Sequence, residues 1–158
     1  MAEVPALGPR GEGWVVLQFL LMGLVAAACV AGPRWPDSVA SALAVAGAVL
    51  AVAGGALVFW SARALGRGLT PFPRPAAHAS CVDHGPYGVV RHPIYAGGAL
   101  FFAGWSLAFS PLALGITAAL VVVWALKITV EERFLRATYP EYEPYCARTR
   151  WRLAPFVF

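Results

Sequence analysis

Four apolar stretches separated by polar segments dominate the chain. They cover residues 14–31, 39–62, 94–109 and 111–130. Each comes near the ~20 residues that a helix needs to cross the roughly 30 Å hydrocarbon core of a bilayer. Because a backbone in hydrocarbon must satisfy its own hydrogen bonds, such stretches can only be helices there. The pattern predicts an all-α fold: one domain over residues 1–158, built as an integral membrane bundle of about four transmembrane helices.

The connections between these stretches predict how the helices pair. Only Ser110 separates the third stretch from the fourth, which begins with Pro111, so the two should form a tight hairpin. In the second stretch Gly47, Ala51 and Gly55 recur every four residues. Such a stripe of small residues lets another helix approach closely, and we expect it to serve in packing.

Composition and charge agree with a membrane protein. Hydrophobic residues make up 59% of the chain and charged residues only 13%, which is too apolar for a soluble domain of this size. Arginines and all the histidines gather in the segment 63–93, and further arginines follow residue 130. The positive-inside rule then places both termini, the long loop and the tail in the cytoplasm, at the plasma membrane if the chain is bacterial. Nucleic-acid binding is not expected, because these basic residues form no separate module.

The segment before the third stretch carries the first concentration of chemistry. Gly85 and Pro86 are typical of a turn, and Pro93 suits the first position of a helix, where an N–H would lack a partner anyway. That helix would start with free amides and a positive dipole end, with Arg91 and His92 beside it. The combination predicts a site for an anion such as a carboxylate or a phosphate.

The fourth stretch ends in a second group of ionisable residues. Lys127, Glu131 and Glu132 follow one another within two turns of helix. The tight hairpin would bring them to the membrane level of Arg91 and His92. Ionisable residues at a helix end can simply reach the membrane surface and pair there. Two carboxylates that face a basic, helix-capped pocket instead favour a functional site.

Three separated elements then agree in order and spacing. They are Gly-Leu-Thr-Pro-Phe-Pro at residues 68–73, Arg-His-Pro-Ile-Tyr at residues 91–95, and Glu131-Glu132 followed by Tyr142, Tyr145 and Pro155-Phe156. Together they resemble the isoprenylcysteine carboxyl methyltransferase and phospholipid methyltransferase superfamily. The resemblance implies a small membrane enzyme that binds S-adenosyl-L-methionine and releases S-adenosylhomocysteine. Its cofactor region would comprise residues 68–97 and 127–156, with the C-terminal tail folded over a cytoplasmic loop.

The resemblance also implies roles for individual residues. Those expected to bind the cofactor are Ala79, Ser80, Cys81, Val82, Tyr87, His92, Pro93, Ile94, Tyr95, Glu131 and Glu132. Those expected to act in catalysis are Arg91, Lys127 and Glu132. Because neighbouring helical residues point about 100° apart, the two glutamates cannot face the cofactor's amino group equally. We expect Glu132 to do so and Glu131 to turn toward Lys127.

The chain departs from the family's pattern in two places. Cys81 and His84 stand where many relatives carry aliphatic and small hydroxyl residues, and Lys127 stands where prenylcysteine enzymes carry arginine. Lysine lacks the bidentate grip of arginine on a carboxylate. The expected acceptor is a membrane lipid or lipophilic small molecule, methylated on a carboxyl group as in the isoprenylcysteine enzymes or on an ethanolamine nitrogen as in the phospholipid enzymes. Both acceptors and the oligomeric state stay open.

Two other classes of function compete with a methyltransferase. His78, Cys81 and His84 offer nitrogen and sulfur ligands at three-residue spacing, but they match no closed zinc pattern, and we expect no bound metal. Alternatively, the arginines of the loop and tail could bind a partner or anionic lipid in a protein without enzymatic activity. Metal analysis would discriminate the first alternative, and tight binding of S-adenosylhomocysteine the second.

Overall fold

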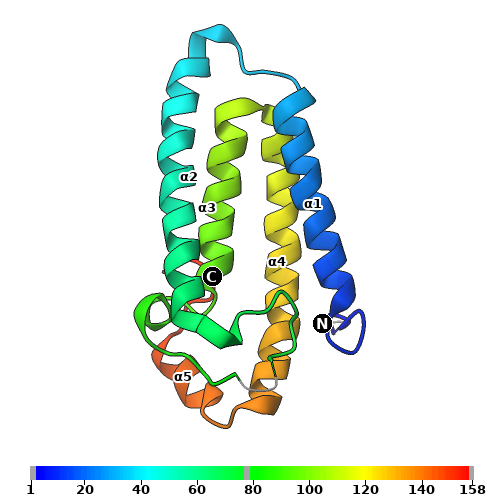
Figure 1. Cartoon of the computed structure of the whole chain (residues 1–158), viewed down its shortest axis with the longest axis vertical. Coiled ribbons are helices and arrows are strands. Elements are labelled where there is room, and N and C mark those ends of the chain that lie inside the picture. The colour runs from blue at the N-terminus through cyan, green and yellow to red at the C-terminus, as the bar shows by residue number, and fades with distance from the viewer. Residues whose placement is uncertain (1–2, 77–78, 157–158) are drawn as a thin grey trace.

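The computed structural model describes residues 3–76 and 79–156. These residues form five α-helices and two short 3-10 turns. The elements are α1 (Glu12–Ala31), α2 (Asp37–Leu65), η1 (Gly66–Gly68), η2 (Gly85–Gly88), α3 (Pro93–Phe109), α4 (Pro111–Thr138) and α5 (Tyr142–Arg148). The four long helices run side by side, and the termini, the α2–α3 loop and α5 lie toward one end of them (Figure 1). The prediction of an all-α bundle with a folded-over tail is confirmed.

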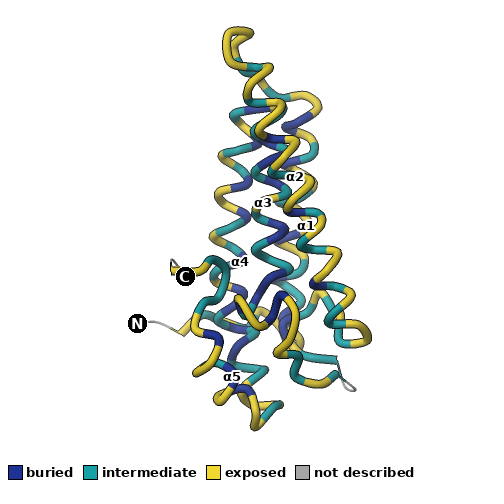
Figure 2. The backbone as a smooth tube through the Cα atoms, turned by 90° about the vertical axis from the view of Figure 1, so that its left-hand side faces the viewer, coloured by how far each residue is buried: buried dark blue, intermediate teal, exposed yellow. Residues whose placement is uncertain are grey.

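Three of the helices are long and apolar enough to cross a membrane: α1, α2 with η1, and α4. The remaining long helix, α3, is also apolar but has only 17 residues. Val45, Val49 and Val52 of α2 are each more than 60% exposed, and exposed segments recur along the helices (Figure 2). Apolar surface of this extent suits lipid and not water. The chain is therefore an integral membrane protein.

Two helices extend past the predicted spans. The α2 helix continues to Leu65, and α4 continues to Thr138 instead of ending where its apolar residues stop. No glycine or proline interrupts residues 131–138, so nothing ends the helix there. Glu131 and Glu132 therefore lie within a helix and not at its end.

Glycines bring α2 and α3 into close contact. A Cβ atom at Gly54 would lie 2.4 Å from the amide nitrogen of Phe101, and one at Gly104 would lie 2.5 Å from the carbonyl oxygen of Gly47. No larger residue fits at either position, so the two backbones touch directly. The predicted stripe is wrong at one end, because a Cβ atom at Gly55 would meet only the ring of Phe101, at 3.8 Å.

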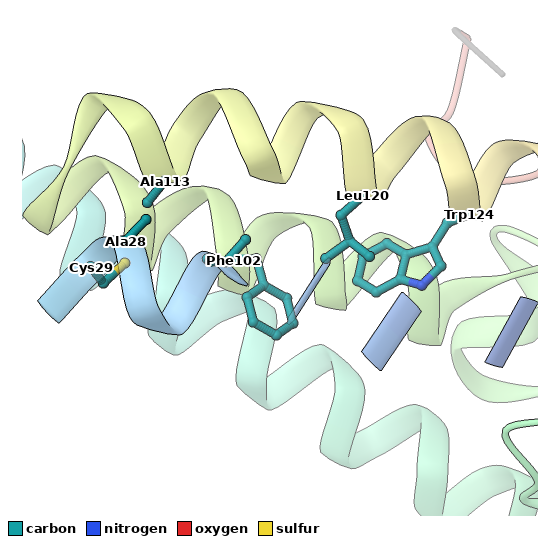
Figure 3. Packing of buried hydrophobic residues seen from close by; sticks show 7 residues of the cluster. Ala28, Cys29, Phe102, Ala113, Leu120 and Trp124 are labelled. Carbon is teal, nitrogen blue, oxygen red and sulfur yellow. The ribbon is translucent and has the colours of Figure 1, made fainter. Parts of the chain in front are cut away.

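A small apolar core joins α1, α3 and α4 (Figure 3). Its buried members are Val25, Ala28, Cys29, Phe102, Ala113, Leu120 and Trp124. The indole of Trp124 lies 5.7 Å from the ring of Tyr95, and a Cβ atom at Gly98 would lie 2.9 Å from that indole. Glycine at position 98 thus leaves room for the indole, which links the apolar core to the polar end of the bundle.

The α3–α4 hairpin is capped at the opposite end of the bundle. The buried hydroxyl of Ser110 accepts a hydrogen bond from the amide of Ala113 at 3.5 Å. The guanidinium of Arg34 donates to the carbonyl oxygens of Cys29 at 3.0 Å and Phe109 at 3.4 Å. These bonds satisfy groups that helix ends leave unpaired. The tight hairpin predicted from the sequence is confirmed.

The segment before α1 packs against the long loop. The guanidinium of Arg10 lies 4.0 Å from the centre of the Phe72 ring, and the amide of Arg74 donates to the carbonyl of Arg10 at 3.3 Å. Gly11 has a φ of +83°, and a Cβ atom there would lie 2.4 Å from the ring of Pro73. This part of the loop is thereby fixed against the start of α1.

Candidate active site

A cavity of about 460 Å³ lies at the end of the bundle that carries the long loop and α5. Its volume is within the range of small-molecule and cofactor sites. Side chains from all five α-helices and from the α2–α3 loop line it, so its wall combines segments that are far apart in the sequence.

The start of α3 forms one wall of the cavity. Pro93 occupies the first helical position, as predicted, and Arg91 and His92 precede it at the cavity. The amides of these two residues donate to the carbonyl oxygens of Trp151 and Arg152, at 2.9 Å each. The C-terminal tail therefore satisfies these two amides and holds the segment just before the helix.

Tyr95 and Glu131 join α3 to α4 in the cavity wall. The hydroxyl of Tyr95 donates a hydrogen bond of 2.8 Å to Oε2 of Glu131, and both side chains line the cavity. Nδ1 of His92 lies 4.0 Å from the other carboxylate oxygen, Oε1. Since a carboxylate can accept several hydrogen bonds, Glu131 retains acceptor capacity toward the cavity.

Lys127 is fully buried and points toward α1. Its ammonium donates to Oε1 of Gln18 at 2.6 Å and to the carbonyl oxygen of Pro71 at 2.7 Å. Over the part of the chain that the structure describes, no ion pair joins Lys127 to Glu131. The ammonium of Lys127 binds the amide oxygen of Gln18, and the carboxylate of Glu131 acts on it only from beyond ion-pair distance.

Glu132 is enclosed by positive side chains and has no exposed surface. Its carboxylate accepts from Nε of Arg91 at 2.9 Å and from Nη2 of Arg152 at 2.8 Å. Nε2 of His92 lies 3.4 Å away without the alignment of a hydrogen bond. The described residues that line the cavity do not include Glu132, so its position does not fit the expected cofactor contact. Its carboxylate instead holds Arg91 and the tail together.

Tyrosines from η2 and α5 form an aromatic wall. The hydroxyl of Tyr145 donates to the carbonyl of Tyr87 at 2.8 Å. The hydroxyl of Tyr142 has no hydrogen-bond partner among the described residues, although the side chain is only 2% exposed. Burial raises the pKa of all three tyrosines well above the ordinary value, so each keeps its proton at neutral pH. An unpaired buried hydroxyl is costly, and a polar group of a bound molecule would satisfy it.

The structure brings most of the predicted site residues to this one cavity. Those that line it are Ala79, Ser80, Cys81, Val82, Tyr87, Arg91, His92, Ile94, Tyr95, Lys127 and Glu131. Pro93, like Glu132, is fully buried behind the wall. Sequence reasoning missed Gln18 and Phe19 of α1. A signal was present for Gln18, which is the only amide side chain in residues 14–31.

The long loop also carries cysteine and histidine residues, which are potential metal ligands. Within residues 3–76 and 79–156, no group of three or more His, Cys, Asp or Glu side chains is arranged to hold a metal ion. His78, which belongs to the alternative metal site, lies outside the described residues. Cys81 is a free thiol at the cavity, and burial raises its pKa.

Fold and cavity together define a class of protein: a helical membrane bundle with a cavity at the end that carries its long loop and its C-terminal tail. The family model described as phospholipid methyltransferase matches residues 42–142. The match reaches from α2 to the start of α5, and the chain belongs to the phospholipid methyltransferase family. The resemblance predicted from the sequence is confirmed. The family is named for methyl transfer to phospholipids.

One curated relative is the cobalt-zinc-cadmium resistance protein CzcN of Cupriavidus metallidurans. The two sequences are 38% identical over 72 residues, which make up 43% of this chain and 32% of that protein. The chain thus spans about a third of the length of the curated relative that it matches. The likeness supports common ancestry of that segment alone.

Proposed function

We propose that this protein transfers the methyl group of S-adenosyl-L-methionine to a lipophilic acceptor at the cytoplasmic face of the membrane. One observation carries the proposal: the loop segment 79–82, the segment 91–95 and Glu131 converge on a single cavity. Glu131 is distant in sequence from the other two segments and meets them only in the folded chain. Membership of the phospholipid methyltransferase family supports the same class of reaction.

The residues of the cavity fit the chemical groups of this cofactor. Glu131 offers a carboxylate for its ammonium group, and Arg91 offers a cation for its carboxylate. The small and apolar side chains of residues 79–82 suit an adenine ring, and the Tyr142 hydroxyl lacks a partner among the described residues. We assign the ammonium contact to Glu131 and not to Glu132, because the carboxylate of Glu132 is already neutralised by arginines.

Positioning is the main contribution that this mechanism asks of the protein. The bound cofactor supplies an already activated methyl group, so methyl transfer needs an aligned acceptor and little acid–base help. The hydrogen bond from Tyr95 fixes the carboxylate of Glu131, and Glu132 fixes the guanidinium of Arg91. The apolar walls keep water from the reacting groups. Glu132 is thus a positioning residue.

The proposed acceptor is a membrane lipid or lipophilic small molecule methylated on a carboxyl group, as in isoprenylcysteine carboxyl methyltransferases. Methylation of an ethanolamine nitrogen, to which the name of the matched family points, is the second candidate. Phe19 supports access from the lipid: it lines the cavity, and 53% of its surface is exposed on α1. An acyl or prenyl chain could therefore enter beside α1.

The cytoplasmic placement of the cavity is part of the same proposal. The arginine-rich loop and tail lie at the end of the bundle that holds the cavity (Figure 1), and such segments stay in the cytoplasm. A cysteine introduced beside Arg74 should react with a membrane-impermeant maleimide only after the cytoplasmic face is opened. Labelling of that cysteine in intact cells would contradict the placement.

Methyl-labelled S-adenosylmethionine tests this function. We expect the purified protein in nanodiscs to transfer the label to a component of a membrane lipid extract. Mild alkali then identifies the acceptor atom, because a methyl ester releases labelled methanol whereas an N-methyl group is stable. A folded protein that transfers label to no lipid fraction would contradict the proposal.

A further inference from the structure

Gln18 is a buried amide on α1, outside the residues that the family model matches. Its Oε1 accepts hydrogen bonds from Nζ of Lys127 at 2.6 Å and from Nε1 of Trp124 at 3.3 Å. An ammonium and an indole N–H can only donate, so the oxygen of the amide must face them. The NH2 group of Gln18 has no acceptor among the described residues, and the side chain lines the cavity.

Lys127 adds a second donor beside this amide. Its ammonium carries three N–H groups, of which Gln18 and the carbonyl of Pro71 take two. The ammonium also lies 5.4 Å from the centre of the Tyr95 ring. In the part of the chain that the structure describes, no carboxylate forms an ion pair with it. The carboxylate of Glu131 acts on this ammonium only from beyond ion-pair distance. An oxyanion in the cavity would accept a hydrogen bond from the remaining N–H group of the buried cation.

The neighbours of this pair are apolar. Phe19, Leu69 and Phe72 line the same cavity, and Phe19 and Leu69 are both more than half exposed. An apolar chain can therefore extend past these residues while its polar head lies deeper, beside Gln18 and Lys127.

We infer that Gln18 and Lys127 together form the subsite for an oxyanion of the methyl acceptor, a carboxylate or a phosphate on an apolar chain. The inference deepens the proposed function and rests on it. The pair offers only donors and a positive charge, so it selects against a cationic head group placed at the same point. Helix α1 thereby contributes to the choice of acceptor from outside the matched part of the chain.

Gln18→Glu separates this role from a purely structural one. The new carboxylate can still accept from Lys127 and Trp124, so the links from α1 to α4 are kept. The variant loses the NH2 donors and places a negative charge where the oxyanion should bind. If Gln18 belongs to an oxyanion subsite, Gln18→Glu should lose the preference for oxyanions. If Gln18 only links the helices, the substitution should leave ligand binding unchanged.

The test uses four probes that share one dodecyl chain: laurate, dodecyl phosphate, methyl laurate and dodecylamine. Binding to the full chain in nanodiscs is measured with and without S-adenosylhomocysteine. We expect laurate or dodecyl phosphate to bind about tenfold more tightly than methyl laurate and dodecylamine, in line with a charge-assisted hydrogen bond. Whichever of the two oxyanions binds more tightly identifies the head group as carboxylate or phosphate.

In Gln18→Glu, the preference for the oxyanions should vanish while the affinity for S-adenosylhomocysteine stays within about twofold. Gly23→Ala is the control on the same helix, because nothing lies within 4 Å of a Cβ atom there. Equal binding of laurate and methyl laurate to the unaltered protein would overturn the inference even if no variant folds. An unchanged preference in Gln18→Glu would overturn it as well. Failure of S-adenosylhomocysteine to bind would instead overturn the proposed function. The two outcomes are distinguishable because the dodecyl probes are also measured in the absence of S-adenosylhomocysteine.

Discussion

Glu131 and Glu132 are consecutive residues of α4, yet Glu131 faces the cavity and Glu132 is buried among arginine side chains. Oε2 of Glu131 accepts the hydroxyl of Tyr95 at 2.8 Å, whereas Oε1 of Glu132 lies 2.9 Å from Nε of Arg91 and has no exposed surface. Neighbours on a helix diverge by about 100°. A single pair of carboxylates can therefore supply one group to a ligand and another to the scaffold that holds Arg91.

Replacing each glutamate by glutamine should give opposite results. Glu131→Gln keeps the shape of the cavity but removes its charge, so the affinity for S-adenosylhomocysteine should fall by about 2–4 kcal/mol with little loss of stability. Glu132→Gln leaves the buried Arg91 without its counter-charge, so the free energy of unfolding should fall by about 3–5 kcal/mol. Calorimetric titration and thermal unfolding in one detergent measure the two effects. Small and equal changes in both variants would contradict the assignment of roles.

The close packing of α2 on α3 predicts that a larger residue at their contact will destabilise the protein. Gly54→Ala should destabilise the bundle by about 1–3 kcal/mol, because a Cβ atom would collide with the backbone of α3. Gly23→Ala is the matched control in α1, where nothing lies within 4 Å of a Cβ atom. Alanine there should be neutral or stabilise by up to about 1 kcal/mol through helix propensity. Midpoints of thermal unfolding that move equally in the two variants would show that the helices are not in direct contact.

Cys81 offers a reporter of cavity occupancy. Burial, aided by the nearby charge of Glu141, raises the pKa of its thiol. Alkylation by iodoacetamide should therefore be slow at neutral pH and faster as the pH rises, because the thiolate is the reactive form. S-Adenosylhomocysteine at about 100 times its Kd should slow the reaction by up to about 100-fold, if only the free cavity reacts.

The control for this labelling is Cys146, a free thiol outside the described lining of the cavity. Its alkylation in a Cys81→Ser variant, followed by mass spectrometry, should be insensitive to the ligand. Protection of Cys146 to the same degree, or no protection of Cys81, would contradict the placement of the cofactor.

Apolar patterning predicted the helices because a membrane leaves the backbone no other way to satisfy its hydrogen bonds. The true end of α4 at Thr138 could not be predicted in this way, since the helix continues through polar residues beyond the apolar span. The hairpin was predictable because a link of one residue, Ser110, allows only an antiparallel turn.

The site was predictable to the extent that its residues lie in recognisable segments. Residues 79–82 and 91–95 line the cavity, apart from the buried Pro93, and their contact with a cofactor stays a prediction. Which glutamate faces the cavity depends on the rotation of α4, which spacing does not fix. The contact of Lys127 with Gln18 joins residues 109 positions apart, and no local sequence pattern predicts such a contact.

The tyrosines of α5 predict a contrast between two similar substitutions. Tyr142→Phe removes a buried hydroxyl that has no partner in residues 3–76 and 79–156. The ligand-free protein should therefore gain about 1 kcal/mol of stability, while its affinity for S-adenosylhomocysteine falls by a similar amount. Tyr145→Phe removes the hydrogen bond to the carbonyl of Tyr87 and should cost about 1 kcal/mol of stability. Thermal unfolding with and without ligand separates the two. Loss of stability in both variants, with affinity unchanged, would show that the Tyr142 hydroxyl does not meet the cofactor.

Calorimetric titration of the purified protein with S-adenosylhomocysteine tests most directly whether this cavity is a cofactor site, because it needs no knowledge of the acceptor. We expect saturable binding of one molecule per chain. His92→Ala and Tyr95→Ala should each weaken it by about 1–3 kcal/mol, since both side chains line the cavity. The Gly23→Ala control should bind like the unaltered protein. Absence of binding by the folded protein, or unchanged affinity in both cavity variants, would contradict the assignment.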